Sequence, residues 1–224
     1  MQEIIKILMT DDHPMIIEGY QNTLLATKKE TQELQIDIAN TCDQSIALMQ
    51  KSIEEESPYD ILFMDISLPP SSDGTITSGE DLSKYARDLL PTAKIVILTM
   101  FNEPYRIHNI IKEIKPEGFV IKSDLTSREL ASAFQAVLNN PPFYSTTVTK
   151  YLKTALESEI EIDDIDRRIL YLLSQGIKTK SLTKHIGIST SSVEKRKKSL
   201  KEVFSITDSQ DETLLKEARN KGFL

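Results

Sequence analysis

Hydrophobic residues in the first 140 positions gather into five short runs, separated by stretches with helical spacing. The runs lie at residues 4–9, 34–39, 61–64, 95–98 and 119–121. Several are continuous rather than alternating, which is typical of strands covered on both faces. One intervening stretch holds Ile107, Ile110, Ile111 and Ile114, the spacing of an amphipathic helix. This alternation predicts an α/β domain with a five-stranded, parallel, doubly wound sheet and right-handed crossovers.

The pattern changes after residue 140. A helix predicted at about 126–138 ends before Pro141 and Pro142, which cannot continue it. A helix is then expected at 146–157, followed by short helices separated by Gly176 and Gly187. We therefore predict a domain over 1–140, a linker with a helix over 141–162, and a small all-α domain over 163–224.

The charge of the chain follows the same division. The formal net charge is -7, which argues against a nucleic-acid partner. However, residues 1–162 carry 14 Lys and Arg against 25 Asp and Glu, whereas residues 163–224 carry 13 against 9. Such an asymmetry favours a polyanion as the partner of the C-terminal part alone.

Cysteine content and hydropathy limit the cellular setting. Cys42 is the one cysteine, so an intrachain disulfide and a Cys-rich zinc site are both excluded. The apolar run at 95–98 is far too short to span a bilayer, and the first residues contain no apolar stretch of signal-peptide length. We expect a cytoplasmic protein with no membrane partner.

Polar residues stand where four of the predicted strands end. Asp11 and Asp12 follow the first strand, Asp65 the third, Thr99 the fourth and Lys122 the fifth. Ligands of open parallel sheets bind beyond these carboxyl ends, so the side chains should converge. Three carboxylates would repel one another unless a hard divalent cation such as Mg²⁺ neutralised them. A hydroxyl and an ammonium group beside that cation suit phosphoryl transfer, with Asp65 as the nucleophile.

Each of these residues also has an ordinary structural interpretation. Asp11 and Asp12 before Pro14 could cap a helix. Thr99 could belong to a turn, and Lys122 could be a solvated surface charge. Singly, each structural interpretation is favoured, but all of these groups on one sheet edge indicate a site.

The N-terminal region resembles the receiver domain of bacterial two-component response regulators. The resemblance rests on residues 7–14 (ILMTDDHP), 60–69 (DILFMDISLP), 95–99 (IVILT) and 118–122 (GFVIK). It implies a flavodoxin-like fold and assigns a role to each matching position. Asp65 accepts phosphate from a sensor histidine kinase, and Lys122 and Thr99 bind phosphoryl oxygens while Phe119 turns inward as a switch. Mg²⁺ is then bound by Asp11, Asp12, Asp65 and the backbone carbonyl of Ser67.

Two features depart from this receiver pattern. Met100 stands where the family usually has a small residue that leaves room for the phosphoryl group. The loop after Asp65 is also long, because the third helix begins only near residues 78–82, roughly a half-dozen residues late. Both features affect access to Asp65, but neither removes an essential group.

The C-terminal region has helix-turn-helix spacing. An apolar helix at 163–174 ends at Gly176, and helices follow at 178–186 and 190–204 with Ser189 as an N-cap. The inner face of the last helix holds Val193, Leu200 and Phe204, and the opposite face is mainly basic. A basic outward face suits the major groove of duplex DNA, although a solvated surface helix would look similar.

This region resembles the LuxR-type (NarL/FixJ-like) DNA-binding domain. The resemblance rests on residues 172–177 (LLSQGI), 186–189 (IGIS) and 192–193 (SV), with Glu194 replacing the family's usual Lys and Arg196 its usual His. Lys195 and Lys198 are our first choices for groove contact, whereas Arg196 and Lys197 are phosphate or packing groups. The candidate DNA-binding residues are Glu194, Lys195, Arg196, Lys197, Lys198 and Lys201. The last helix, with Leu214, Leu215 and Ala218, either forms a dimer or packs on its own domain.

The sequence thus favours a transcription regulator rather than an enzyme. Phosphorylation of Asp65 would shift an equilibrium that controls homodimer formation and DNA binding by the C-terminal domain. Any turnover would be an intrinsic autophosphatase activity. One alternative is a receiver-controlled protein-interaction module that does not bind DNA, and another is a Mg²⁺-dependent phosphohydrolase that uses the same carboxylates.

Overall fold

A computed structural model of the chain describes residues 3–157 and 160–224. The predicted linker at 141–162 includes residues 158 and 159, which lie outside the described residues. The chain divides into two compact units, which are described separately below. The first comprises Met1–Asn102 and Asn109–Thr149, and the second comprises Glu103–His108 and Lys150–Leu224.

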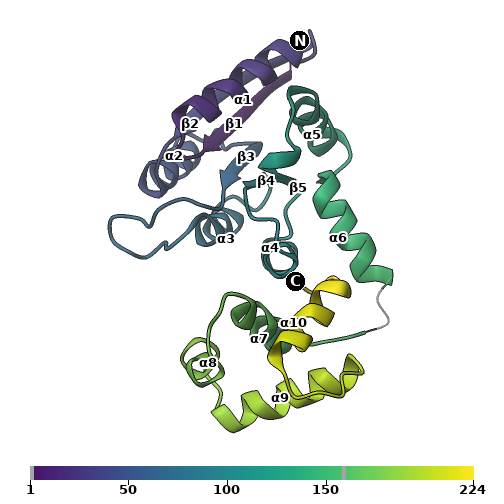
Figure 1. Ribbon diagram of the computed structural model, residues 1–224. Helices are drawn as coiled ribbons and strands as arrows, with labels where there is room; N and C mark the ends of the chain where they lie inside the picture. The colour runs from purple at the N-terminus through teal and green to yellow at the C-terminus, as the bar shows by residue number, and fades with distance from the viewer. Residues whose placement is uncertain (1–2, 158–159) are drawn as a thin grey trace. The chain divides into compact units, whose positions relative to one another are not determined.

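The first unit is built on an all-parallel sheet (Figure 1). Its strand order is β2-β1-β3-β4-β5-β6. The strands are β1 (Glu3–Thr10), β2 (Gln32–Ala39), β3 (Ile61–Asp65), β4 (Lys94–Thr99), β5 (Gly118–Ile121) and β6 (Phe143–Tyr144). The predicted α/β fold is confirmed, and the helices between the strands make it doubly wound. The helices and the 3-10 turn up to residue 157 are α1 (Pro14–Thr27), α2 (Cys42–Glu54), α3 (Gly79–Leu89), α4 (Pro104–Ile114), η1 (Lys122–Asp124), α5 (Ser127–Asn139) and α6 (Thr146–Glu157). The residues of α4 and of α6 are each divided between the two units.

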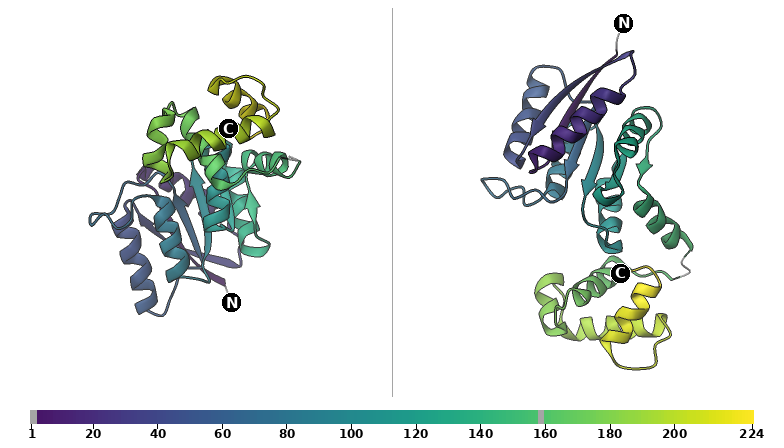
Figure 2. Two further views of the ribbon diagram at one scale, coloured as in Figure 1. Left: turned by 90° about the horizontal axis from the view of Figure 1, so that it is seen from below. Right: turned by 45° about the horizontal axis from the view of Figure 1, so that its top comes forward.

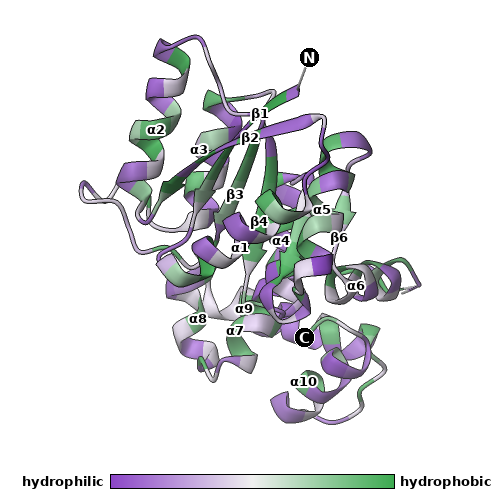
Figure 3. Cartoon of the chain, turned by 90° about the horizontal axis from the view of Figure 1, so that it is seen from above, coloured by the Kyte–Doolittle hydropathy of each residue, from purple (hydrophilic) through white to green (hydrophobic). Residues whose placement is uncertain are grey.

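The burial of the strands explains their hydrophobic runs. Every residue of β3 and β5 is buried, because helices cover both faces of the sheet there. The edge strand β2 instead mixes buried and exposed positions. Figure 3 shows this contrast as apolar colouring on β1, β3 and β4 beside a more polar β2. One core cluster packs Ile17 and Leu24 of α1 and Phe134 of α5 against the sheet.

Within the described residues the sheet has six strands, one more than the five predicted. The additional strand β6 contains only Phe143 and Tyr144, directly after the two prolines. It pairs in parallel with β5, because Phe143 N–H donates to the Glu117 carbonyl and Ser145 N–H donates to the Phe119 carbonyl. Two residues form no recognisable hydrophobic run, so the pattern could not reveal this strand.

The β3–α3 connection is long and well bonded. It extends from the body of the first unit as a loop (Figure 2). The Ser72 N–H donates to both carboxylate oxygens of Asp43 at 3.2 and 3.0 Å, which ties the loop to the first turn of α2. The Cys42 thiol is buried and lies 3.3 Å from the Pro69 carbonyl. Cys42 is therefore a buried residue that packs against this loop.

Within the described residues 160–224, the second unit contains four helices with a common apolar core. They are α7 (Asp164–Ser174), α8 (Thr179–Ile186), α9 (Thr190–Val203) and α10 (Asp211–Asn220). Val193, Leu200 and Phe204 of the α9 segment are buried, as their spacing predicts. Ser189 caps α9 by accepting from the Ser192 N–H. Gly176 and Gly187 have φ of +79° and +76°, which explains glycine after α7 and α8.

Candidate functional site

Asp11, Asp65 and Lys122 meet at the carboxyl edge of the sheet. The Lys122 ammonium donates to Asp11 Oδ2 at 2.6 Å and to Asp65 Oδ2 at 2.9 Å. All three side chains are buried, with exposed fractions of 3%, 2% and 7% for Asp11, Asp65 and Lys122. The parallel register explains the meeting, since β3 lies between β1 and β4 and β4 pairs with β5. Two buried carboxylates thus share one buried cation.

Burial and the Lys122 ammonium act in opposite directions on Asp65. Burial raises the pKa of Asp65, and the hydrogen bonds from Lys122 and from the Ser67 N–H only partly offset this effect. For Lys122, burial lowers the pKa, but the bonds to Asp11 and Asp65 outweigh burial and the net shift is upward. The cluster therefore holds its lysine charged and keeps an excess of carboxylate that favours a further cation.

Asp12 and His13 complete the acidic cluster. His13 Nδ1 lies 2.6 Å from Asp12 Oδ1 and 3.2 Å from Asp11 Oδ1. One ligand atom from each of Asp11, Asp12, His13 and Asp65 can be chosen so that all lie within 4.8 Å of one another. Three carboxylates at this spacing could hold a metal ion, and oxygen donors are those that a hard divalent cation prefers. The sequence did not place His13 among these donors.

The remaining predicted receiver residues lie around this edge. Thr99 is fully buried at the end of β4, and its hydroxyl accepts from the Phe101 N–H at 3.1 Å. Phe119 is fully buried in β5, and Met100 is 63% exposed. The Ser67 N–H donates to Asp65 Oδ1 at 3.2 Å. The two oxygens of Asp65 thus have different partners, Ser67 on one and Lys122 on the other.

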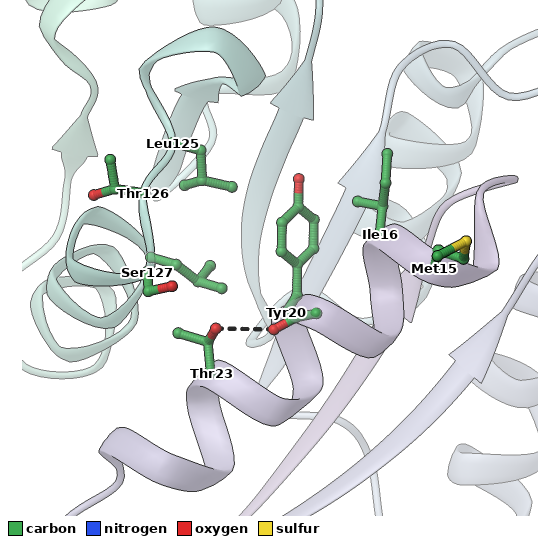
Figure 4. A pocket seen from close by; sticks show the side chains of 9 residues that line it. Met15, Ile16, Tyr20, Thr23, Leu125, Thr126 and Ser127 are labelled. Atoms are coloured by element: carbon green, nitrogen blue, oxygen red, sulfur yellow. Dashed lines mark hydrogen bonds between the residues drawn. The ribbon is translucent and has the colours of Figure 1, made fainter.

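Tyr20 was not predicted as a residue of this site, although the charges of the acidic cluster affect its pKa. Burial raises the pKa of Tyr20 to about 12; Lys122 lowers it, and Asp11 and Asp65 raise it. Its ring points into a cavity of about 320 Å³ between α1 and the start of α5 (Figure 4). The cavity is lined by Met15, Ile16, Gly19, Tyr20, Thr23, Leu125, Thr126, Ser127 and Leu130. Helical spacing alone could not distinguish this half-buried tyrosine from core.

Gly79 supports the end of β3 through its lack of a side chain. A Cβ atom at this position would lie 1.9 Å from the Asp65 carbonyl oxygen. The Gly79 N–H instead donates to the Ile66 carbonyl at 3.1 Å, at the start of α3. The sequence indicated a helix start at residues 78–82, but the close approach to Asp65 depends on tertiary contact.

Two of the predicted basic residues of α9 face solvent. Lys195 and Lys198 are exposed, and the Lys198 side chain is 81% accessible. Lys198 Nζ lies 4.0 Å from Glu202 Oε1, a distance that gives a weak surface pair. Glu194 is also exposed, at 57% of its side chain. This face therefore combines two exposed cations with exposed acids.

The other three basic residues are bonded inside the second unit. The guanidinium of Arg196 donates to Asp163 Oδ2 at 2.7 Å and to Asp166 Oδ1 at 2.9 Å. The ammonium of Lys197 donates to Asp211 Oδ2 at 2.7 Å and to Thr179 Oγ1 at 3.0 Å. Lys201, a third member, donates to the Ser209 carbonyl. The sequence showed these charges but gave no sign of their acidic partners, which are distant along the chain.

Sequence relatives cover most of the chain, although no protein-family model matches it. The transcriptional regulatory protein MctR of Rhizobium johnstonii is 26% identical over 205 residues, covering 91% of this chain and 88% of MctR. The oxygen regulatory protein NreC of Staphylococcus aureus is 24% identical over 204 residues, covering 86% of this chain and 87% of NreC.

Solved structures show the same fold along nearly the whole chain. The RcsB response regulator of Salmonella typhimurium has a TM-score of 0.60 and 21% identity, covering 96% of this chain and 98% of RcsB. A structure of two RcsB dimers bound to two parallel DNAs has a TM-score of 0.62 at 21% identity, covering 97% and 98%. The chain is thus similar in sequence to transcriptional and oxygen regulatory proteins and similar in fold to RcsB response regulators.

The described helices were also compared with the length of a membrane span. Across residues 3–157 and 160–224, no helix combines the length and apolar character that crossing a bilayer requires.

Proposed function

We propose that the chain is a phosphorylation-regulated, DNA-binding transcription regulator of a two-component system. Its receiver would span residues 1–140, its linker 141–162 and its DNA-binding domain 163–224. The observation that carries the proposal is the Lys122 ammonium between Asp11 and Asp65, at 2.6 and 2.9 Å. In this proposal the protein acts in the cytoplasm with a sensor histidine kinase as its phosphodonor.

Asp65 is the proposed phosphoryl acceptor. One of its carboxylate oxygens attacks the phosphorus of a phosphohistidine, so a P–O bond forms while the P–N bond breaks and its electron pair stays on the imidazole. Lys122 neutralises charge on the transferred group, and the Thr99 hydroxyl donates to another phosphoryl oxygen. Movement of Thr99 leaves space for Phe119 to act as the switch. Attack of water on the acyl phosphate would be the intrinsic autophosphatase step.

Mg²⁺ is the proposed cofactor of this step. The residues fit it, because Asp11, Asp12 and Asp65 supply oxygen donors and Lys122 alone leaves the cluster with surplus negative charge. With the backbone carbonyl of Ser67, these carboxylates would hold the ion. When bound, the ion supplies charge neutralisation that lets a phosphoryl group approach three carboxylates. Asp65 then remains the nucleophile.

The first experiment tests the acceptor. We expect Asp65→Asn to abolish Mg²⁺-dependent labelling of the full chain by acetyl phosphate, read on a phosphate-affinity gel, because an amide is not a comparable nucleophile. Asp88→Asn changes an exposed carboxylate of α3 and should label as the wild type does. Labelling that persists in Asp65→Asn would show that the acceptor assignment is wrong.

The second experiment tests the DNA partner. The full chain, treated with acetyl phosphate, is titrated against a mixed-sequence duplex at increasing salt. Binding should weaken with a log–log slope of roughly -0.9 for each phosphate contacted. The chain treated with acetyl phosphate should also form homodimers, which analytical ultracentrifugation would detect. No binding even at low salt would favour the alternative, a protein-interaction module that docks an acidic partner.

A further inference from the structure

The basic residues of α9 differ in their surroundings: some are bonded to other helices and others are exposed to solvent. This difference indicates two roles. We propose that Arg196 and Lys197 are positioning residues that fix the orientation of α9, and that DNA contact falls to Lys195 and Lys198. The proposal rests on the proposed function, because it takes α9 as the helix that meets DNA. The proposal divides the candidate DNA-binding residues according to their bonds within the second unit. Residue type and spacing do not reveal these bonds.

The first support is where Arg196 and Lys197 are bonded. Arg196 binds Asp163, the N-cap of α7, and also Asp166 in the first turn of that helix. Lys197 binds the first residues of two further helices, Thr179 of α8 and Asp211 of α10. Two adjacent residues of α9 therefore contact the N-terminal ends of α7, α8 and α10, the other helices that the structure describes within residues 160–224.

The second support is burial. The Lys197 side chain is only 8% exposed, whereas that of Lys198 is 81% exposed. A buried ammonium that contacts a phosphate must first give up Asp211 and Thr179, which offsets much of the gain. An exposed lysine loses no protein partner of that kind. Lys197 is thus buried at the N-terminal ends of α8 and α10, whereas the exposed Lys198 can contact DNA.

The third support is the geometry of the shared face. Lys195 and Lys198 are three residues apart and so lie on one side of the helix, together with Ser191 and Ser199, and all four are exposed. Arg196 and Lys197 lie off that side. A tilt of α9 would move the exposed lysines together, so bonds that fix the tilt would affect affinity without touching DNA.

Asp211→Asn gives the sharpest test, because the two interpretations predict opposite signs. It removes a negative charge from the domain and releases Lys197. If Lys197 positions α9, affinity of the full chain for a mixed-sequence duplex should fall roughly fivefold, equivalent to about 1 kcal/mol. If Lys197 is instead a groove or phosphate contact, its release should raise affinity. Glu212→Gln is the matched control, since it removes the next, exposed charge of α10 and should not weaken binding.

The salt dependence of duplex binding provides a second readout. It separates residues that contact DNA from residues that act only through the position of α9. Lys195→Met and Lys198→Met should each reduce the log–log slope by about 0.9, because each removes a cation that displaces a counterion from the DNA. Lys197→Met should lower affinity and keep the slope of the wild type, and Lys197→Arg should restore affinity. A slope that falls by about one unit in Lys197→Met, or unchanged affinity in that variant, would overturn the proposal.

Folding is controlled within the same experiment. Each variant is measured at a temperature where circular dichroism shows it fully folded. Should Asp211→Asn fail to fold, Thr179→Val removes the other Lys197 acceptor without a change of charge and carries the same expectation of weaker binding. Absence of duplex binding by the wild type itself would instead refute the proposed function, whereas tighter binding by Asp211→Asn would refute only the positioning role.

Discussion

Two buried lysines, Lys122 and Lys197, are exposed to a similar extent and both bond to carboxylates, but their roles differ. The Lys122 side chain is 7% exposed and bonds to two carboxylates that are themselves 3% and 2% exposed. The Lys197 side chain is 8% exposed and bonds to Asp211, whose side chain is 35% exposed. The acids around Lys122 are buried, whereas those around Lys197 are partly solvated: Asp211 at 2.7 Å and the exposed Glu194 at 3.5 Å. Buried acids around a lysine mark a site for chemistry, and partly solvated acids mark a structural link.

The largest expected effect separates these two lysines. Lys122→Met leaves Asp11 and Asp65 buried without a cation, so the free energy of unfolding should fall by about 3–5 kcal/mol. Labelling by acetyl phosphate should fall roughly 100-fold, the loss typical of removing one charge-stabilising donor. Lys197→Met leaves an acid that water reaches, so its loss of stability should be smaller. Urea denaturation of both variants measures the difference.

Addition of Mg²⁺ to the same two variants sharpens the contrast. The ion can replace the missing cation in Lys122→Met and should recover part of the lost stability, because a ligand that binds only the folded state stabilises it. Lys197→Met should gain no more from Mg²⁺ than the wild type does. Equal recovery in both variants would mean that the acidic edge is not where the ion binds.

The next effect concerns how the backbone holds the acidic edge. Gly79→Ala places a methyl group 1.9 Å from the Asp65 carbonyl oxygen, so α3 or the end of β3 must shift. We expect a loss of about 3 kcal/mol in the free energy of unfolding, together with slower phosphoryl labelling. Gly19→Ala is the control, because nothing lies within 4 Å of the added carbon and alanine favours the helix. Thermal melts of the two variants should move in opposite directions.

The smallest effect is the pH dependence that the buried Asp65 carboxylate contributes. Since burial raises its pKa in the folded state, the folded protein retains this proton at a pH where the unfolded chain has lost it. Stability is then penalised as pH rises through the folded-state pKa, and the penalty disappears on acidification. Asp65→Asn should therefore raise the melting temperature of the metal-free protein at neutral pH. The gain should vanish at acid pH, and a gain that grows on acidification would contradict this assignment.

Much of the fold could be predicted because burial on both faces leaves a direct mark on the sequence. The continuous run at 95–98 appeared as β4, and the spacing from Ile107 to Ile114 appeared as α4 with Ile107, Ile110 and Ile114 buried. Strand β6 could not be predicted in this way, since two residues carry no periodicity and depend on the exposed edge of β5.

The residues of the candidate site also fall into those that the sequence could group and those that it could not. Asp11, Asp65 and Lys122 could be grouped because parallel strands end at one edge, which topology alone requires. His13, Tyr20 and Gly79 could not be assigned their places there, since their roles depend on distances between segments. The basic residues of α9 could be found in the sequence, but not which of them are bonded to distant residues and which are exposed.

For this protein the sequence by itself determined the order of the five longer strands and the helices between them, the acidic residues at the strand ends and the basic character of residues 163–224. Those properties are local, because they arise from periodicity, caps and charge along the chain. Only the tertiary structure decided that Lys122 joins Asp11 to Asp65 and that Lys197 joins Thr179 to Asp211. An ion pair depends on the distance between atoms that are remote in sequence, and the packed fold alone sets that distance.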